Sequence, residues 1–304
     1  MPVIQVQSPG MFTTVQDLGR YGYGPLGVSP SGAADSLALR IGNLIVGNRE
    51  SAAALEMTLM GGTFAFPDGA VVALAGSDFS APVPMWAALP IEPGGILKLG
   101  PTRTGARCYL CVAGGIEVPL FLGSASTHVL TGLGGFGGRA LRKGDVLNIG
   151  RSKGVPRVIA PGLIEPFAPR KILRTTVAPQ TAWFSRQSID RLYGGAYRVT
   201  EESNRMGLRL EGAALETPHS GQMTSEGVSL GAIQVPAGGQ PIILFVEQQT
   251  TGGYPTIANV ISADLARVGQ LRPRDEVRFE LVDAETARAL ILEQDRLLRA
   301  LSSA

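Results

Sequence analysis

Histidine, cysteine and lysine are scarce in this chain of 304 residues, which holds two histidines, two cysteines and four lysines. Neither His128 nor His219 lies in a G-x-S-x-G setting, so triad-type nucleophilic catalysis has little support. Cys108 and Cys111 form a C-x-x-C pair, with no second pair to complete a zinc site. Both lie in one predicted strand, where positions three apart face opposite sides. We therefore predict two buried structural thiols and no metal site.

Long apolar runs and a strong net charge are also lacking. No apolar run approaches the ~20 residues that a membrane-spanning helix needs. The first ten residues, MPVIQVQSPG, have neither the basic nor the apolar region of a signal peptide. The net charge of +2 is too small to favour a nucleic-acid or membrane surface. We therefore expect a cytoplasmic protein without nucleic-acid or membrane partners.

Glycine and proline, in contrast, are abundant, with 40 and 21 residues spread along the chain without a period. The composition, 44% hydrophobic and 17% charged, is typical of a globular protein of about two domains. Short apolar segments between turns predict a mainly β fold with a few helices. The clearest predicted strands are residues 3–7, 54–58, 71–75, 96–99, 108–112, 145–149, 172–177 and 197–200.

The proline-rich residues 152–169 are predicted to link two domains. The first domain, residues 1–155, is expected to be β-barrel-like with one helix near residues 33–46. The second domain, residues 170–304, is expected to be a β-barrel that ends in a helix. Asp283 precedes the apolar positions of this last helix and is its predicted cap.

The N-terminal helix follows a glycine-rich stretch. Residues 11–28 contain four glycines and are predicted to form a shaped loop instead of a regular element. Ser31 is the predicted cap of the helix, and Asp35 lies in its first turns, where a carboxylate complements the helix dipole. That placement explains Asp35 whether or not it has a further role. One face of the helix is apolar, through Leu37, Ile41, Leu44 and Ile45.

The strongest pattern of the C-terminal half lies in residues 225–255. Residues 242–246 are an unbroken apolar run and predict a strand buried on both faces. This strand leads into the polar residues 247–251 and then into a Gly-Gly turn. A rigid strand that carries polar groups to a glycine loop is typical of a binding site. A tight turn capped by its own hydroxyls has the same pattern, so both interpretations stay open.

Nucleotide-binding motifs receive no support. The glycine-rich residues 132–138 formally contain G-x-G-x-x-G. A dinucleotide fingerprint requires a helix directly after the glycines, whereas a polar turn follows here. The sequence also lacks a G-x-x-x-x-G-K-[ST] motif. Binding of ATP would therefore need a different cradle or another chain.

Seven segments together carry a resemblance to a known family, the allophanate hydrolase subunit 2-like group. The group includes the KipA proteins, the C subunit (PxpC) of bacterial 5-oxoprolinase and the carboxyltransferase region of urea carboxylase. The resemblance extends over nearly the whole chain. The matching segments are TTVQDLGRYGYGPLGVSPSGAADSLALRIGNLIVGN, ALEMTLMGG, CVAGGIEVPLFLGSAST, GLGGFGGRALRKGD, ESNRMGLRLEG, SEGVSLGAIQVPAGGQPI and QTTGGYPTIANVISADL.

This resemblance implies two cyclophilin-like β-barrel halves and a hetero-oligomer with a KipI-like (PxpB-like) partner. It also points to a LamB/YcsF-like (PxpA-like) protein as a further subunit. The implied catalytic residues are Asp35, Asn204, Arg205 and Glu226. The implied substrate-binding residues are Arg20, Tyr21, Ser203, Ser225, Gln234, Gln249, Thr250, Thr251 and Tyr254. Asp17, Ser31 and Met206 belong to the same motifs.

The chain departs from the usual family pattern at three positions. Ala34 stands where the family has Met before the helix aspartate, and Ala125 where it often has Arg. Glu247 stands where it often has Asp, which keeps the charge but lengthens the arm.

Three functions agree with the resemblance. The one we favour is ATP-dependent opening of 5-oxoproline to glutamate, with ATP shared with the partner subunit. The second is biotin-dependent carboxyl transfer. None of the four lysines has a methionine neighbour, as a biotinyl lysine of this class typically has, so a biotin carrier would act in trans. The third is a KipA-like regulatory protein that binds a KipI-like kinase inhibitor.

Overall fold

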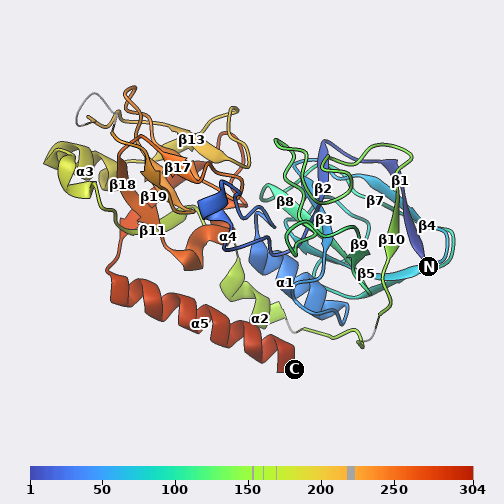
Figure 1. Cartoon of the computed structure of the whole chain (residues 1–304). Helices are drawn as coiled ribbons and strands as arrows, with labels where there is room; N and C mark the ends of the chain where they lie inside the picture. The colour runs from blue at the N-terminus through green and yellow to red at the C-terminus, as the bar shows by residue number, and fades with distance from the viewer. Residues whose placement is uncertain (153, 160, 169, 218–222, 304) are drawn as a thin grey trace. The chain divides into compact units, whose positions relative to one another are not determined.

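The computed structural model describes residues 1–152, 154–159, 161–168, 170–217 and 223–303, so that His219 lies outside the described part. The chain is mainly β, as predicted (Figure 1). It forms two compact units. The first contains residues 1–20, 31–168 and those from Leu297 on, and the second contains residues 21–30 and 170–296. The predicted domain limits, 1–155 and 170–304, stay a prediction.

Two five-stranded antiparallel sheets form the first unit. Their apolar faces share one core cluster, in which Ile4 and Phe64 come from one sheet and Leu55 and Leu110 from the other. Removing these side chains from water stabilises the unit by roughly 25 cal/mol per Å² of apolar surface. The strand order across one sheet is β7 (Gly95–Lys98), β4 (Thr63–Phe66), β1 (Val3–Ser8), β10 (Val146–Ile149) and β9 (Ile116–Glu117). The strand order across the other sheet is β2 (Phe12–Gln16), β3 (Ala54–Thr58), β8 (Arg107–Val112), β5 (Ala70–Gly76) and β6 (Leu89–Ile91).

The prediction of a loop over residues 11–28 is wrong for residues 12–16, because Phe12–Gln16 forms β2 and pairs with β3. The sequence concealed this strand, since Thr13, Thr14 and Gln16 are polar and yet fully buried. Apart from the amide oxygen of Gln16, their polar groups are satisfied inside the fold, as when the Thr13 hydroxyl donates to the carbonyl of Pro9. The predicted strand at residues 54–58 is confirmed and coincides with β3.

Helix α1 (Ser36–Ile45) packs against β5 and β8 (Figure 1). Its cap is Asp35, whose carboxylate accepts the N–H of Ala38 at 2.9 Å. The predicted cap, Ser31, is wrong. Ser31 has a φ of 55° and its hydroxyl donates instead to the carbonyl of Thr127.

Both cysteines lie on β8 as free, buried thiols, as predicted. Cys108 belongs to the core between the sheets, whereas Cys111 lies against α1, close to Gly42 and the carbonyl of Leu39. The two side chains therefore point to opposite faces of the sheet. Burial raises the pKa of each thiol well above its usual range, so both stay protonated and unreactive at neutral pH.

A closed barrel forms the second unit, and all its strand pairs are antiparallel except the β11–β19 pair. The rings of Tyr197 and Phe279 pack together with centroids 6.0 Å apart. A two-stranded ribbon, β14 (Glu226–Gly227) and β17 (Thr251–Gly252), lies outside the ring. In order around the ring, the strands are β11 (Ile172–Val177), β18 (Thr256–Val260), β15 (Ala232–Gln234), β16 (Ile242–Leu244), β13 (Gly207–Glu211), β12 (Tyr197–Val199) and β19 (Glu276–Leu281).

The predicted strand at residues 242–246 is shorter than expected, because the ladder of β16 ends at Leu244. The N–H of Phe245 then donates to Met206, and the N–H of Gln248 donates back to Phe245, which forms a turn. Residues 243–246 are nevertheless buried, as the apolar run predicted. The polar residues 247–251 therefore follow directly after a buried segment whose position is fixed.

The remaining elements are short, apart from the last helix. Asp283 caps that helix as predicted, because its carboxylate accepts the N–H of Thr286 at 2.7 Å. This bond lowers the pKa of Asp283. No helix within the described residues is long and apolar enough to cross a membrane. The elements are η1 (Gly24–Leu26), α2 (Pro161–Ile164), η2 (Glu165–Phe167), η3 (Thr181–Trp183), α3 (Arg186–Gly194), η5 (Ser262–Asp264), α4 (Leu265–Val268) and α5 (Ala284–Ser303).

Asp264 is the fully buried carboxylate of the second unit and ties β11 to α4. It accepts the backbone N–H of Arg174 at 2.8 Å and two guanidinium bonds from the same residue at 3.0 and 2.6 Å. Arg267 donates to it at 2.5 Å. The bonds to Asp264 raise the pKa of Arg174, whereas burial lowers the pKa of Arg267.

We predict that Asp264→Ala lowers the free energy of unfolding of the second unit by about 3–5 kcal/mol, because it leaves two guanidinium groups without their buried partner. Urea denaturation at pH 7 measures this change. The control is Asp190→Ala, which removes an exposed i,i+4 pair with Arg186 and should cost less than about 0.5 kcal/mol. Equal effects of the two substitutions would contradict the assignment.

Candidate functional site

The predicted site residues fall into two groups, one in each unit, and each group is described by itself. Asp17, Arg20, Ser31 and Asp35 belong to the first unit. The others belong to the second unit, including Tyr21, which lies in the segment 21–30 with 70% of its surface exposed.

Asp17 follows β2 and fastens a distant loop to its end. Its carboxylate accepts the hydroxyls of Ser124 at 2.6 Å and Ser126 at 2.5 Å. The backbone N–H groups of Gly19 and Ala125 donate to it at 2.8 and 2.7 Å. Four donors occupy both carboxylate oxygens, which makes Asp17 a structural anchor.

Arg20 braces the same loop from inside. It is 2% exposed, and its guanidinium donates to the carbonyls of Phe121, at 3.3 Å, and Ser126. It also lies over the ring of Phe121, 5.4 Å from the centroid. These contacts are with the protein itself, and the role of Arg20 in binding a substrate stays a prediction.

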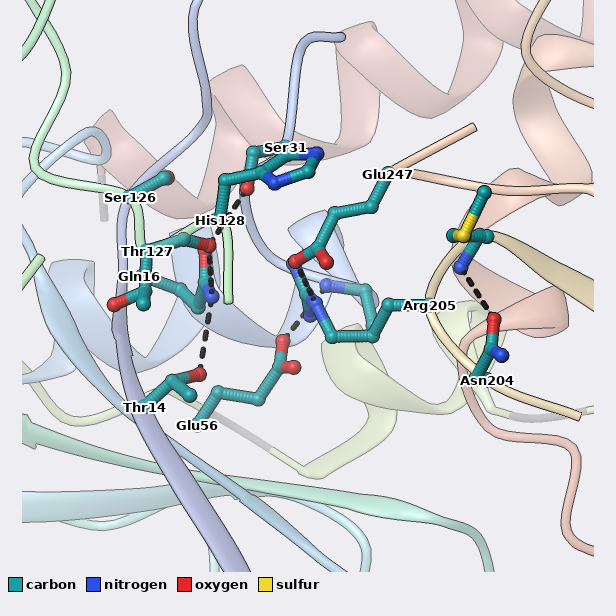
Figure 2. A network of polar contacts seen from close by, with 12 residues as sticks. Thr14, Gln16, Ser31, Glu56, Ser126, Thr127, His128, Asn204, Arg205 and Glu247 are labelled. Atoms are coloured by element: carbon teal, nitrogen blue, oxygen red, sulfur yellow. Dashed lines mark hydrogen bonds and ion pairs between the residues drawn. The ribbon is translucent and has the colours of Figure 1, made fainter. Parts of the chain in front are cut away.

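Gln16, Ser31 and Thr127 form a buried polar group beside this loop (Figure 2). The amide nitrogen of Gln16 donates to the hydroxyl of Thr14 at 3.0 Å and to the carbonyl of Thr127 at 3.1 Å. The Ser31 hydroxyl donates to the same carbonyl at 2.8 Å. The amide oxygen of Gln16 is buried and has no hydrogen-bond partner within the described part of the chain.

The glycine-rich residues 132–138 pack on this loop. Gly134 and Gly135 have φ angles of 65° and 56°. A Cβ atom at Gly134 would lie 2.2 Å from the carbonyl oxygen of Ser126, and one at Gly135 would lie 1.8 Å from the hydroxyl of Thr127. Only glycine permits this approach at Gly134, and the positive φ angles of Gly132 and Gly137, 68° and 64°, favour glycine there, so the local backbone conformation explains the G-x-G-x-x-G pattern.

Sequence reasoning missed two residues that position Asp35. Glu56 is 1% exposed and accepts the hydroxyl of Tyr109 at 2.6 Å and the N–H of Ala34 at 2.7 Å. The Tyr109 hydroxyl in turn accepts the N–H of Asp35 at 2.7 Å. A side chain from β3 and one from β8 therefore hold the start of α1 and its capping carboxylate. The sequence feature that could have pointed to Glu56 is its position as the single carboxylate in the mainly apolar strand ALEMT.

In the second unit, Arg205 and Glu247 form a buried ion pair at 2.5 Å, in which the side chains point toward each other (Figure 2). The backbone N–H of Glu247 also donates to the carbonyl of Arg205 at 2.9 Å. The loop at residues 203–206 thus lies beside the polar residues that follow β16.

Ser203 and Asn204 shape their own turn. The Asn204 amide oxygen accepts the N–H of Met206 at 2.8 Å (Figure 2). The Ser203 hydroxyl accepts the N–H of Arg209 at 3.0 Å. Such local bonds are typical of turns. The predicted catalytic roles of Asn204 and Arg205 stay predictions.

A cluster of glutamine side chains brings several predicted residues of the second unit together. Gln234 donates to the carbonyl of Tyr254 at 3.2 Å, and Gln249 donates to the amide oxygen of Gln234 at 3.2 Å. Gln180, which sequence reasoning missed, donates to the carboxylate of Glu226 at 2.7 Å and accepts the N–H of Thr256 at 3.3 Å.

The two-stranded ribbon outside the barrel adds the remaining predicted residues. Glu226 pairs with Gly252 and Gly227 pairs with Thr251. Thr250 accepts the N–H of Val228 through its carbonyl, and the Ser225 hydroxyl lies close to Gly253.

Gln248 is one of the predicted polar residues 247–251, although no site role was assigned to it. It is buried and donates to the carbonyl of Val228 at 3.2 Å. Its amide oxygen is buried without a hydrogen-bond partner among the described residues. An unsatisfied acceptor of this kind costs about 1–3 kcal/mol, which a donor on a ligand would recover. No group of His, Cys, Asp and Glu within the described residues is arranged to hold a metal ion.

We predict that Tyr109→Phe lowers the free energy of unfolding at pH 7 by about 1–3 kcal/mol, because it deprives Glu56 of a donor and Asp35 of an acceptor. Burial and the neighbouring Glu56 carboxylate raise the pKa of Tyr109 well above its usual range. Its protonated form therefore contributes stability that is fully present below about pH 10 and is lost as the pH rises further.

Stability measured by urea denaturation between pH 7 and pH 11 checks this prediction. The decrease in the free energy of unfolding above pH 10 should be smaller in Tyr109→Phe than in the unmodified protein. Some decrease should remain, because burial also raises the pKa of Tyr197, to about 12. Tyr23→Phe is the control, since no hydrogen bond of the Tyr23 hydroxyl exists within the described part of the chain. Identical alkaline profiles for all three proteins would contradict the role given to Tyr109.

Comparison with known proteins adds three relatives. The chain is 39% identical to the C subunit of the 5-oxoprolinase of Escherichia coli (strain K12), over 99% of this chain and 98% of the relative. It is 33% identical to the urea amidolyase of Lachancea kluyveri, over 98% of this chain and 18% of that protein. The crystal structure of the K. lactis urea amidolyase matches 98% of this chain and 20% of that protein, with 32% identity and a TM-score of 0.92.

The chain thus spans about a fifth of the length of the urea amidolyases that it matches. A family model described as the carboxyltransferase domain, subdomain A and B, matches residues 26–281, which is most of the chain. The chain therefore belongs to the carboxyltransferase subdomain A and B family, within which it is similar to the 5-oxoprolinase C subunit along its whole length.

Proposed function

We propose that this protein is a subunit of a 5-oxoprolinase-type complex that opens 5-oxoproline to glutamate with hydrolysis of ATP. The observation that carries the proposal is the extent of the match. The similarity covers 98% of the E. coli 5-oxoprolinase subunit, whereas it covers only 18% of the urea amidolyase. A KipI-like (PxpB-like) subunit and a LamB/YcsF-like (PxpA-like) subunit are the proposed partners, and the cytoplasm is the proposed location.

The polar groups of the second unit suit an amide ring. A lactam presents one N–H donor and one carbonyl acceptor, and glutamine side chains offer the complementary acceptor and donors. Gln248 supplies a buried amide oxygen without a partner among the described residues, which is the acceptor that a lactam N–H needs. Gln234 and Gln249 hold the adjacent loop in place.

Glu226 is the side chain to which we assign proton transfer. When the C–N bond of the ring breaks, the nitrogen must gain a proton, and a positioned carboxyl group supplies such a proton efficiently. Glu226 is exposed and is oriented by its bond from Gln180. The sequence has no P-loop, so we place ATP in a cradle shared with the KipI-like subunit.

Reconstitution tests the proposal. We expect the chain, mixed with a KipI-like and a LamB/YcsF-like subunit, to hydrolyse ATP in a manner stimulated by 5-oxoproline, with release of glutamate. The controls are each pair of subunits and the complete mixture without 5-oxoproline. A stable complex without this stimulation would contradict the proposal and would favour the KipA-like regulatory role.

The reconstituted complex also tests Glu226. We predict that Glu226→Gln lowers kcat by roughly 10²–10⁴-fold, because the amide keeps the shape of the carboxylate but cannot transfer the proton. The matched control is Glu211→Gln, which removes another exposed carboxylate of the second unit and should leave kcat unchanged. An unchanged kcat in Glu226→Gln would remove this residue from the mechanism.

Biotin-dependent carboxyl transfer is the second candidate, because the matching family model is described as a carboxyltransferase domain. It predicts transfer of a carboxyl group from a biotinylated carrier protein supplied in trans. The same preparation therefore discriminates the two functions. Transfer of the carboxyl group from an added carboxybiotinyl carrier to a nitrogen of an acceptor such as urea, with free biotinyl carrier left behind, would favour carboxyl transfer, whereas 5-oxoproline-stimulated ATP hydrolysis without a carrier favours the first proposal.

A further inference from the structure

A hollow of about 740 Å³ lies in the first unit, where three segments distant in sequence meet. One wall is the turn after α1, another is the turn between β8 and β9 with the residues up to Leu120, and the third is Arg151, two residues after the end of β10. Small-molecule sites typically enclose roughly 300–1,000 Å³, so the hollow has the size of a ligand site. Its lining contains none of the predicted site residues.

Two asparagines hold the segments that line this hollow, Asn48 from within the lining and Asn43 from α1 behind it. The amide of Asn48 donates to the carbonyl of Val112 at 2.8 Å and accepts the N–H of Gly114 at 2.8 Å. Asn43 donates to the carbonyl of Ala52 at 2.7 Å. These bonds fix the two turns to each other, so the hollow is a constructed feature of the fold and does not depend on a mobile loop.

Arg49 and Arg151 supply its positive charge. Arg49 lies in the turn after α1, and Arg151 is placed beside the second turn because the preceding N–H, of Gly150, donates to Gly115 at 3.0 Å. Within the described part of the chain, neither guanidinium has a carboxylate at ion-pair distance. Arg40 nearby shows the contrast, since it is paired with a carboxylate.

One carboxylate, that of Glu117, also lines the hollow. Two arginines and one glutamate leave the lining with a net charge of +1. Leu120, which is 64% exposed, adds an apolar wall. The lining therefore fits a small molecule that has an anionic group and some apolar surface.

We propose that this hollow is a binding site for a small anion, either a carboxylate or a phosphate ester, held by Arg49 and Arg151. A guanidinium presents several donors in a planar fork that matches both kinds of oxyanion. Two such groups at one hollow give directional contacts in addition to charge. None of the lining residues belongs to the glutamine cluster, so this inference does not rest on the function proposed above.

Isothermal titration of the full chain at low ionic strength tests this site, with inorganic phosphate in one series and succinate in the other. We expect saturable binding of at least one of the two anions. The double variant R49A/R151A should bind that anion roughly tenfold more weakly or worse, because it loses the charge-assisted bonds. Binding of phosphate alone assigns the phosphate class, and binding of succinate alone assigns the carboxylate class.

Two further variants make the test specific. R103A/R142A removes the same charge from exposed arginines elsewhere in the first unit and should leave the affinity within twofold. Glu117→Gln should tighten binding several-fold, because it removes a carboxylate that repels the anion. Three results would each overturn the proposal: neither anion binds the unmodified chain, R49A/R151A binds as tightly as the unmodified chain, or R103A/R142A loses as much affinity as R49A/R151A.

Discussion

The structure depends on carboxylates that are half-buried, as Asp17 is, or fully buried, as Asp264 is, and whose oxygens accept hydrogen bonds from the protein itself. A buried carboxylate is costly unless it is paired and hydrogen-bonded, so each one fixes several groups around it. Asp17 collects four donors and fastens the loop at residues 124–126. Asp264 collects bonds from two arginines and joins β11 to α4. In both places, the position of a loop is fixed because one carboxylate must accept hydrogen bonds from several donors.

This constraint separates side chains that hold the structure from those that remain available to a ligand. Glu247 and Arg205 satisfy each other in a buried pair, and Asp17 is saturated. Glu226, in contrast, is exposed and oriented by one amide. The amide oxygen of Gln248 is the reverse case, since it is buried but unsatisfied within the described residues. A ligand that offers a donor gains more at such an atom than at a saturated one.

The sequence predicted the mainly β class and several strands because apolar runs between turns are local signals. It placed β3 correctly and recognised Asp283 as a cap. It missed β2, where Thr13, Thr14 and Gln16 look like loop residues although they are buried, and where Gln16 donates to Thr127, more than 100 positions away. A local pattern cannot show that a polar side chain will meet such a partner.

The candidate site was predictable to a similar extent. The family motifs pointed to the neighbourhoods of Glu226 and Gln234, which the structure does bring into one group of loops. They did not show Gln180, which reaches Glu226 from 46 positions away, or the Glu56–Tyr109 bond behind Asp35. These residues lie outside the motifs that carry the predicted site residues, since Glu56 and Tyr109 belong to strands β3 and β8 and Gln180 belongs to the turn before η3. Their function is to position neighbours, and this function exists only after folding.

The scarcity of lysine has a physical counterpart in how the cations of this protein are used. A guanidinium donates from several nitrogens in a plane, so one arginine can bind two carbonyls, as Arg20 does, or both oxygens of a carboxylate, as Arg139 does with Asp145 at 2.7 and 2.8 Å. A lysine ammonium is a compact point charge and cannot reproduce these fixed directions. Most arginines that hold this structure together can therefore be recognised by the carbonyl and carboxylate oxygens that accept hydrogen bonds from their guanidinium groups. Arg49 and Arg151 differ because their charge faces a hollow, and an oxyanion is the partner that completes the same geometry.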